Sequence, residues 1–70
     1  MVRLMEFMLI RRISDRKFLS KYGWVYTDDF SKMAIYQDED RALALARQAS
    51  LHAAPSEVVY MTTFISDVKV

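Results

Sequence analysis

The residues that could carry chemistry are few. The 70-residue chain has no cysteine, a single glycine and a single histidine, His52. It therefore lacks a thiol nucleophile, a glycine-rich phosphate loop and a metal cluster at ligand spacing. No serine or carboxylate stands in a recognisable catalytic relation to His52, which falls in the last turn of a predicted helix, where a cation complements the helix dipole. The sequence predicts a protein that is not an enzyme and uses no cofactor or metal ion.

Acidic side chains gather in the middle of the chain. They are Asp28, Asp29, Asp38, Glu39 and Asp40. A calcium-binding loop needs acidic residues at alternating positions around a central glycine, and this cluster has neither. A short side-chain oxygen before a helix accepts hydrogen bonds from its first N–H groups, and negative charge suits the positive end of its dipole. We expect these carboxylates to serve turns and a helix cap.

Cations and aromatic rings alternate in the first half of the chain. The candidate partner-binding residues are Arg11, Arg12, Arg16, Lys17, Lys21, Tyr22 and Trp24. Such a mixture suits contact with a protein, where charges steer an acidic partner and a ring anchors it. It also suits single-stranded nucleic acid, where rings stack on bases and cations meet phosphates. Because the net charge is only +1, below the usual basic footprint, we favour a protein partner and keep nucleic acid as the alternative.

Apolar periodicity divides the chain into several strands and one helix. We predict long strands over residues 2–13 and 57–68, shorter ones over 17–20 and 32–36, an extended piece over 24–27, and a helix over 38–52. The polar break at Ser14-Asp15-Arg16 is long enough for a hairpin loop, so the first two strands should pair antiparallel. Gly23 falls where a turn needs positive φ, and Pro55 ends the helix. The order β-β-β-α-β predicts one compact α+β domain over residues 1–70, with a small antiparallel sheet and one helix packed on one face.

The first and last predicted strands are apolar on both faces. Residues of alternate parity point to opposite sides of a sheet. One side would hold Met5, Phe7, Leu9, Val59, Met61 and Ile65, and the other Leu4, Met8, Val58 and Tyr60. One helix covers one face, so the other would be an exposed apolar patch of the kind that marks an interface. We therefore predict a homodimer, formed through that face or along an exposed edge strand.

Part of the sequence resembles short phage and prophage proteins. The run from Phe18 to Tyr36 carries the resemblance through Gly23-Trp24, the acidic turn Asp28-Asp29 and Ala34-Ile35-Tyr36, followed by Asp38-Glu39-Asp40 and Ala42. The resemblance implies an accessory phage protein that binds a host macromolecular complex and modulates or inhibits it, including defence systems such as CRISPR complexes. It implies no individual site residue.

Two further features bear on where the protein works. The absence of cysteine fits a reducing compartment, and no uncharged stretch approaches the roughly 20 apolar residues that a membrane-spanning helix needs. We expect a cytoplasmic protein that makes no membrane contact. If the chain is phage-encoded, that cytoplasm is the host cell's.

Overall fold

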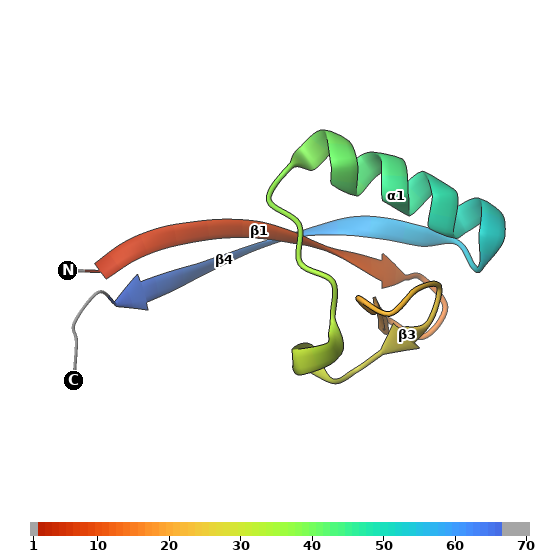
Figure 1. The fold of residues 1–70 in the computed structure, drawn as a ribbon, viewed down its shortest axis with the longest axis horizontal. Coiled ribbons are helices and arrows are strands. Elements are labelled where there is room, and N and C mark those ends of the chain that lie inside the picture. The colour runs from red at the N-terminus through yellow and green to blue at the C-terminus, as the bar shows by residue number, and fades with distance from the viewer. Residues whose placement is uncertain (1, 67–70) are drawn as a thin grey trace.

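The chain folds into a four-stranded antiparallel sheet with one helix. The computed structural model describes residues 2–66, and side-chain surroundings for residues 4–63. The elements in chain order are β1 (Val2–Arg12), β2 (Phe18–Leu19), β3 (Tyr26–Thr27), the 3-10 helix η1 (Phe30–Lys32), α1 (Glu39–His52) and β4 (Ser56–Ser66). The spatial order of the strands is β3-β2-β1-β4 (Figure 1). The predicted α+β class and its β-β-β-α-β order are confirmed.

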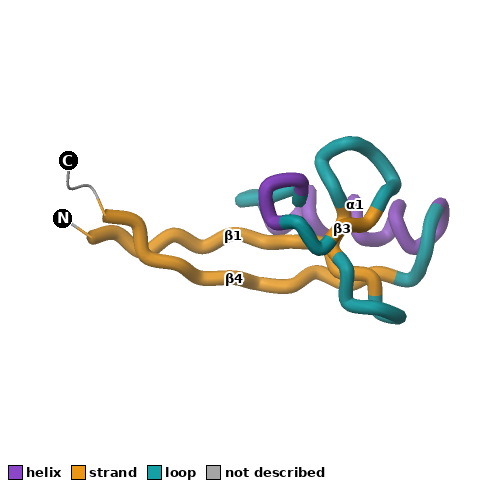
Figure 2. The backbone as a smooth tube through the Cα atoms, turned by 90° about the horizontal axis from the view of Figure 1, so that it is seen from below, coloured by secondary structure: helices purple, strands orange, loops and turns teal. Residues whose placement is uncertain are grey.

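A long ribbon of β1 and β4 runs the length of the molecule. The two strands pair antiparallel from Val2 opposite Ser66 to Arg12 opposite Ser56. The expected pairing of the first two strands is also confirmed, but β2 joins β1 only at the far end of the ribbon, with Arg11 opposite Phe18. Residues 2–4 of β1 and 64–66 of β4 therefore extend beyond the rest of the fold, and we call them the arm. Figure 2 shows the arm leaving the covered part of the sheet, which we call the body.

The predicted strand over residues 32–36 is wrong. The carboxylate of Asp29 accepts hydrogen bonds from the N–H (3.0 Å) and the hydroxyl (2.7 Å) of Ser31, which closes the turn of η1. After η1 the chain passes from the edge of β2 to the edge of β1, making one bridge to each, Met33 to Ser20 and Tyr36 to Met8. A segment that changes partners in four residues cannot extend a ladder, so the third strand is the short extended piece at Tyr26–Thr27.

Both faces of the sheet carry packed apolar residues. On one face Ile10 and Leu19 pack with Ala46 and Ala49 of α1. On the opposite face, which we call the far face, Phe7 and Leu9 pack with Met33. The alternation expected for the long strands is thus observed for residues 4–63, but the far face is not left bare, because the segment after η1 covers part of it. The side-chain directions expected for Val2 and Ile65, and strand residues beyond 66, lie outside the described residues.

The helix begins and ends as its sequence predicts. The Asp38 carboxylate accepts hydrogen bonds from the N–H groups of Asp40 (3.0 Å) and Arg41 (3.4 Å), so capping by the acidic cluster is confirmed. The alanine stripe Ala42, Ala46 and Ala49 is buried against the sheet. Small side chains let the helix backbone approach the strands closely. The helix ends at His52, three residues before Pro55, and no helix among the described residues is long and apolar enough to cross a membrane.

Candidate binding surfaces

Two of the candidate cations are held by carboxylates of the same chain. The Arg11 guanidinium donates to Glu57 on the adjacent strand (Nε to Oε1 3.0 Å), and Arg12 donates to Asp15 in the following turn (Nε to Oδ1 2.9 Å). Because successive strand residues point to opposite faces, the two arginines do not share a surface. Arg12 also lies over the Tyr26 ring, 4.4 Å from its centroid. Both side chains thus stabilise the end of the sheet, where their charges are already paired.

The Arg12–Asp15 contact also shifts acid–base equilibria. Hydrogen bonding to the guanidinium is the main cause that lowers the pKa of Asp15 to about 2. The same hydrogen bond raises the pKa of Arg12. Asp15 further accepts a hydrogen bond from the backbone N–H of Lys17, at 3.2 Å. The turn between β1 and β2 is therefore organised around one ionised carboxylate.

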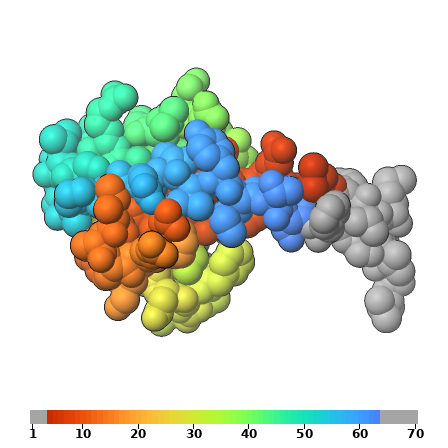
Figure 3. All heavy atoms as spheres, turned by 180° about the vertical axis from the view of Figure 1, so that it is seen from behind, coloured from red at the N-terminus to blue at the C-terminus, as the bar shows by residue number. Residues whose placement is uncertain are grey.

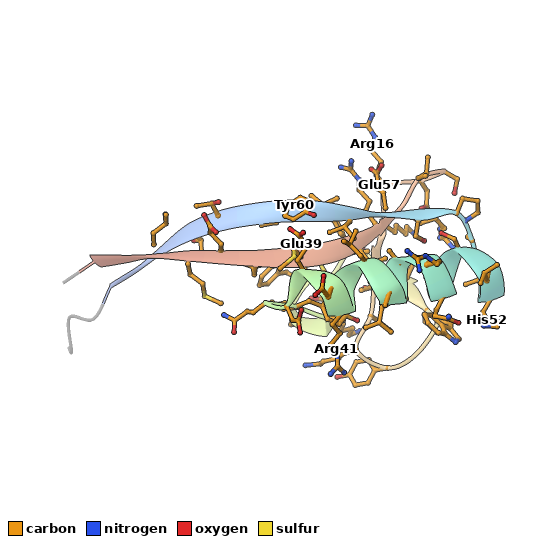
Figure 4. All side chains as sticks on the ribbon, turned by 90° about the horizontal axis from the view of Figure 1, so that it is seen from above. Arg16, Glu39, Arg41, His52, Glu57 and Tyr60 are labelled. Carbon is orange, nitrogen blue, oxygen red and sulfur yellow. The ribbon has the colours of Figure 1, made fainter. Side chains whose placement is uncertain are left out.

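The remaining candidates fall into two groups. Arg16 and Lys17 are exposed in the β1–β2 turn, where Arg16 adopts a φ of 60°. Lys21, Tyr22 and Trp24 lie in the β2–β3 loop, which passes alongside α1, and the Trp24 ring lies 6.1 Å from that of His52. In Figure 4 Arg16 lies beyond β4, on the opposite side of the ribbon from His52 and Arg41. The structure therefore does not join the seven candidates into one surface.

The β2–β3 loop is shaped by its glycine. Gly23 has a φ of +120°, as its position predicts, and a Cβ built there meets nothing within 4 Å. The backbone conformation, not lack of space, is what requires glycine. The loop leaves a shallow hollow of about 260 Å³ against the helix, bounded by Lys21, Trp24, Arg41 and Leu45.

His52 is engaged in local contacts. Its Nε2 lies 3.0 Å from Oε1 of Gln48, one turn earlier in the helix, and its ring is tilted against Trp24. Within residues 2–66 no three histidine, cysteine or acidic side chains come together in a way that could hold a metal ion.

A large apolar hollow lies on the far face in the form of a groove. It has a volume of about 490 Å³ and an apolar lining that includes Met5, Phe7, Phe30, Ile35 and Met61. We call it the far-face groove. Phe30, Ile35 and Met61 are exposed by 57%, 45% and 37%. The apolar far-face parity of the long strands is the one sequence signal for this site. The sequence pattern places Ile35 in a strand and does not indicate a role for Phe30.

A second hollow lies on the helix face of the ribbon. It has a volume of about 410 Å³ and is bounded by Glu6, Gln37, Glu39 and Tyr60. In Figure 4 the side chains of Glu39 and Tyr60 lie near one another. Partial desolvation, followed by the nearby Glu39 carboxylate, raises the pKa of Tyr60. This hollow is more polar than the far-face groove, and the carboxylates of Glu6 and Glu39 give it negative charge.

Comparison with known proteins adds no relatives to this description. No protein-family model, no curated protein and no solved structure matches the chain.

Proposed function

We propose that this chain is a non-enzymatic binding protein whose far-face groove receives an apolar segment of a partner protein. The observation that carries the proposal is the groove itself. Three large side chains, Phe30, Ile35 and Met61, stay exposed around one hollow in a chain of 70 residues. Contiguous apolar surface of this kind is typical of binding sites on soluble proteins.

The chemistry of the lining favours an apolar protein segment. Met5 and Met61 have flexible, polarisable side chains that adapt to the shape of a bound group, and Phe30 supplies the large, flat surface that anchors interfaces. The hydroxyl of Thr63, on the same face as Met5, offers a polar contact to a partner backbone. An inserted aromatic or branched aliphatic side chain would remove both itself and Phe30 from water.

The surroundings of His52 support the non-enzymatic part of the proposal. Its ring contacts Trp24 and its Nε2 contacts Gln48, and neither group is a nucleophile or an acid that a histidine could activate. Replacing His52 with Ala should therefore leave the biological effect intact. A small loss of stability is expected, because a favourable group near the helix C-terminus is removed.

The resemblance to short phage proteins supports a finer proposal. On that resemblance, the partner belongs to a host macromolecular complex, such as a CRISPR complex, and binding modulates or inhibits it. Arg16 and Lys17, exposed in the β1–β2 turn, would steer an acidic partner surface toward the protein.

Site-specific photo-crosslinking tests the groove. A photoreactive residue at Phe30 should capture a partner from host lysate, whereas the same residue at Leu51, exposed by 71% on the helix, should not. With the purified partner, Ile35→Asp should weaken binding by about tenfold or more, since it places a charge among desolvated apolar groups. Leu51→Asp should leave the affinity unchanged, and equal effects at the two sites would contradict the proposal.

An oligonucleotide titration separates the nucleic-acid alternative. If single-stranded DNA or RNA is the partner, affinity should fall with salt with a slope of about 0.7 per phosphate contact, and Arg16→Glu with Lys17→Glu should abolish binding. Binding of that kind with no effect of Ile35→Asp would overturn the proposal. A protein whose groove binds an apolar segment should instead show no oligonucleotide binding at physiological salt.

A further inference from the structure

The outer edge of β4 presents unpaired backbone groups. The N–H of Met8 donates to the carbonyl of Tyr36 (2.7 Å), and the N–H of Tyr36 donates to the carbonyl of Met8 (2.9 Å). Both polar groups of Met8 thus point away from β4, so Met8 and its neighbour Tyr60 do not exchange hydrogen bonds. The backbone groups of Tyr60 must then point to the other side of β4. By the same alternation, those of Val58 and Thr62 do so as well.

This edge is open in the described structure. The sheet ends at β4, and among residues 2–66 no backbone or side-chain group bonds the outward groups of Val58, Tyr60 or Thr62. In Figure 3 β4 crosses the front of the molecule in blue, with α1 above it and the segment near residue 30 below it. The edge is therefore open from Val58 to Thr62.

The composition of β4 does nothing to block pairing. Natural edge strands are commonly protected by lysine, proline or an inward-pointing charge. Between Val58 and Ser66 this strand holds no charged residue and no proline, and its sequence is rich in β-branched and aromatic residues. The single charge of the strand, Glu57, is held by Arg11. Such a strand is a template for another strand.

The arm is a second reason to expect another strand at the edge of β4. Its residues form a two-stranded ribbon with no third strand and no helix over it (Figure 2). An isolated two-stranded ribbon is at best marginally stable in water, and a third strand is normally needed. Leu4, on the arm, is exposed by 57%. A strand added along β4 would give the arm its third strand and would leave the body unchanged.

We infer that β4 pairs antiparallel with β4 of a second copy of this chain, about a two-fold axis at Met61. Met61 is the middle residue of Ser56–Ser66, so this register uses the edge from Val58 to Phe64. Ser56 lies outside the paired stretch, because its N–H donates to the Ser50 hydroxyl of α1 (3.0 Å) and its carbonyl accepts from the same hydroxyl (3.3 Å). It pairs Tyr60 with Thr62 and Val58 with Phe64 through their outward-facing backbone groups, and it sets Glu57 opposite Ile65. At none of these positions do two like charges face one another. The arm of each copy then lies beside the body of the other.

The contact area that the β4 edge offers sets the expected stability of the dimer. The paired stretch from Val58 to Phe64 is about 24 Å long at a rise of about 3.4 Å per residue. With side chains on both faces the contact is roughly 15 Å deep, so on the order of 350 Å² is covered per copy, compared with roughly 800 Å² in a standard interface. We expect a dimer that dissociates on dilution. The inference does not depend on the partner proposed for the far-face groove, because edge pairing leaves the sheet faces open.

Two neighbouring prolines provide a matched test by analytical ultracentrifugation over about 1–500 µM. Thr62→Pro removes an N–H that points to the open edge, so the fold should persist while dimerisation is lost. Met61→Pro removes an N–H of the β1–β4 ladder and should disrupt the ribbon itself. If Thr62→Pro fails to fold, Thr62→Lys blocks the edge by charge, with Thr62→Ala as its control. A monomeric wild-type protein, or dimers that persist in both Thr62→Pro and Thr62→Lys, would overturn the inference.

A cysteine at the axis tests the register. The chain has no cysteine, so Met61→Cys introduces a single thiol. Opposite residues of a non-hydrogen-bonded pair have Cα atoms about 4.5 Å apart, close enough for an intermolecular disulfide. Under mild oxidation Met61→Cys should crosslink rapidly, whereas Ser31→Cys, exposed in η1, should not. Faster crosslinking at Ser31, or loss of the dimer in Phe30→Asp with no effect of Thr62→Pro, would assign the contact to the far face and sink the edge model.

Discussion

The same two strands pass through two different environments. In the body, β1 and β4 lie between α1 on one face and the segment after η1 on the other, and Leu9 and Ile10 are almost completely buried. In the arm, the ladder continues in the same register to Val2 opposite Ser66, but Leu4 is largely exposed. Backbone pairing is therefore common to both regions, and side-chain burial is what separates them. Most of the folding free energy must come from the body.

The largest expected difference is between deletions in these two regions. Ile10→Ala leaves a cavity between β1 and α1 and should lower the free energy of unfolding by about 2–5 kcal/mol. Leu4→Ala removes a side chain that is already in water, so its cost should stay below about 1 kcal/mol. Urea unfolding at a low protein concentration measures both. Because a chain of this size is marginally stable, Ile10→Val, expected to cost about 0.5–1.5 kcal/mol, serves if Ile10→Ala does not fold.

Equal losses at the two positions would contradict the comparison. They would mean that Leu4 is buried in the species being measured. Unfolding should then be measured at protein concentrations above and below that at which the dimer forms. If the Leu4→Ala loss appears only at the higher concentration, Leu4 is buried by the second copy and not within one chain.

The elements that depend on residues close together in the chain could be predicted from the sequence. The long strands follow from alternating apolar residues, and the helix follows from Asp38, the alanine stripe and Pro55, all of which act within a few residues. The region from residue 28 to 36 could not be assigned in this way. Its apolar residues fit a strand, but Asp29 closes a 3-10 turn with Ser31 and the following residues bridge two different strands.

The candidate site shows the same division. Strand alternation already implies that Arg11 and Arg12 face opposite ways. The partner of Arg11, however, is Glu57, which is 46 residues away in sequence, and no local pattern indicates that pairing. The far-face groove brings Met5, Phe30 and Met61 together from three separate segments. Surfaces that depend on tertiary contacts of this kind required the structure.

Enlarging a buried alanine of α1 should have an intermediate effect on stability, because the helix lies close to the sheet. Ala49 is fully buried, whereas Ala44 is exposed on the same helix. Ala49→Leu adds atoms where there is no room and should cost about 1–3 kcal/mol. Ala44→Leu keeps a good helix former on the surface and should change stability by less than about 0.5 kcal/mol. Thermal unfolding of the two variants compares them, and a tolerated Ala49→Leu would mean that α1 is only loosely packed on β1.

The smallest expected effect on stability is at Asp15, in the turn between β1 and β2, and it depends on pH. The folded pKa of Asp15 is lowered from 3.8 to about 2, mainly by the hydrogen bond from Arg12. A lowered folded pKa means that the unfolded chain binds a proton first as the pH falls. The stabilisation is therefore complete above about pH 4 and is lost as the pH drops toward 2. Because the group is exposed, solvent screening keeps the effect small.

Replacing Asp15 with Asn removes this titration. The wild-type protein should have the higher melting temperature at pH 6, and the difference from Asp15→Asn should shrink between pH 4 and pH 2 until the two curves meet. In an Arg12→Gln background the donor is absent, so Asp15→Asn should have little effect at any of these pH values. A difference that stays constant down to pH 2 would show that the ionised carboxylate is not its source. A pH-dependent difference that survives in the Arg12→Gln background would assign it to the bond from the Lys17 N–H and not to the ion pair.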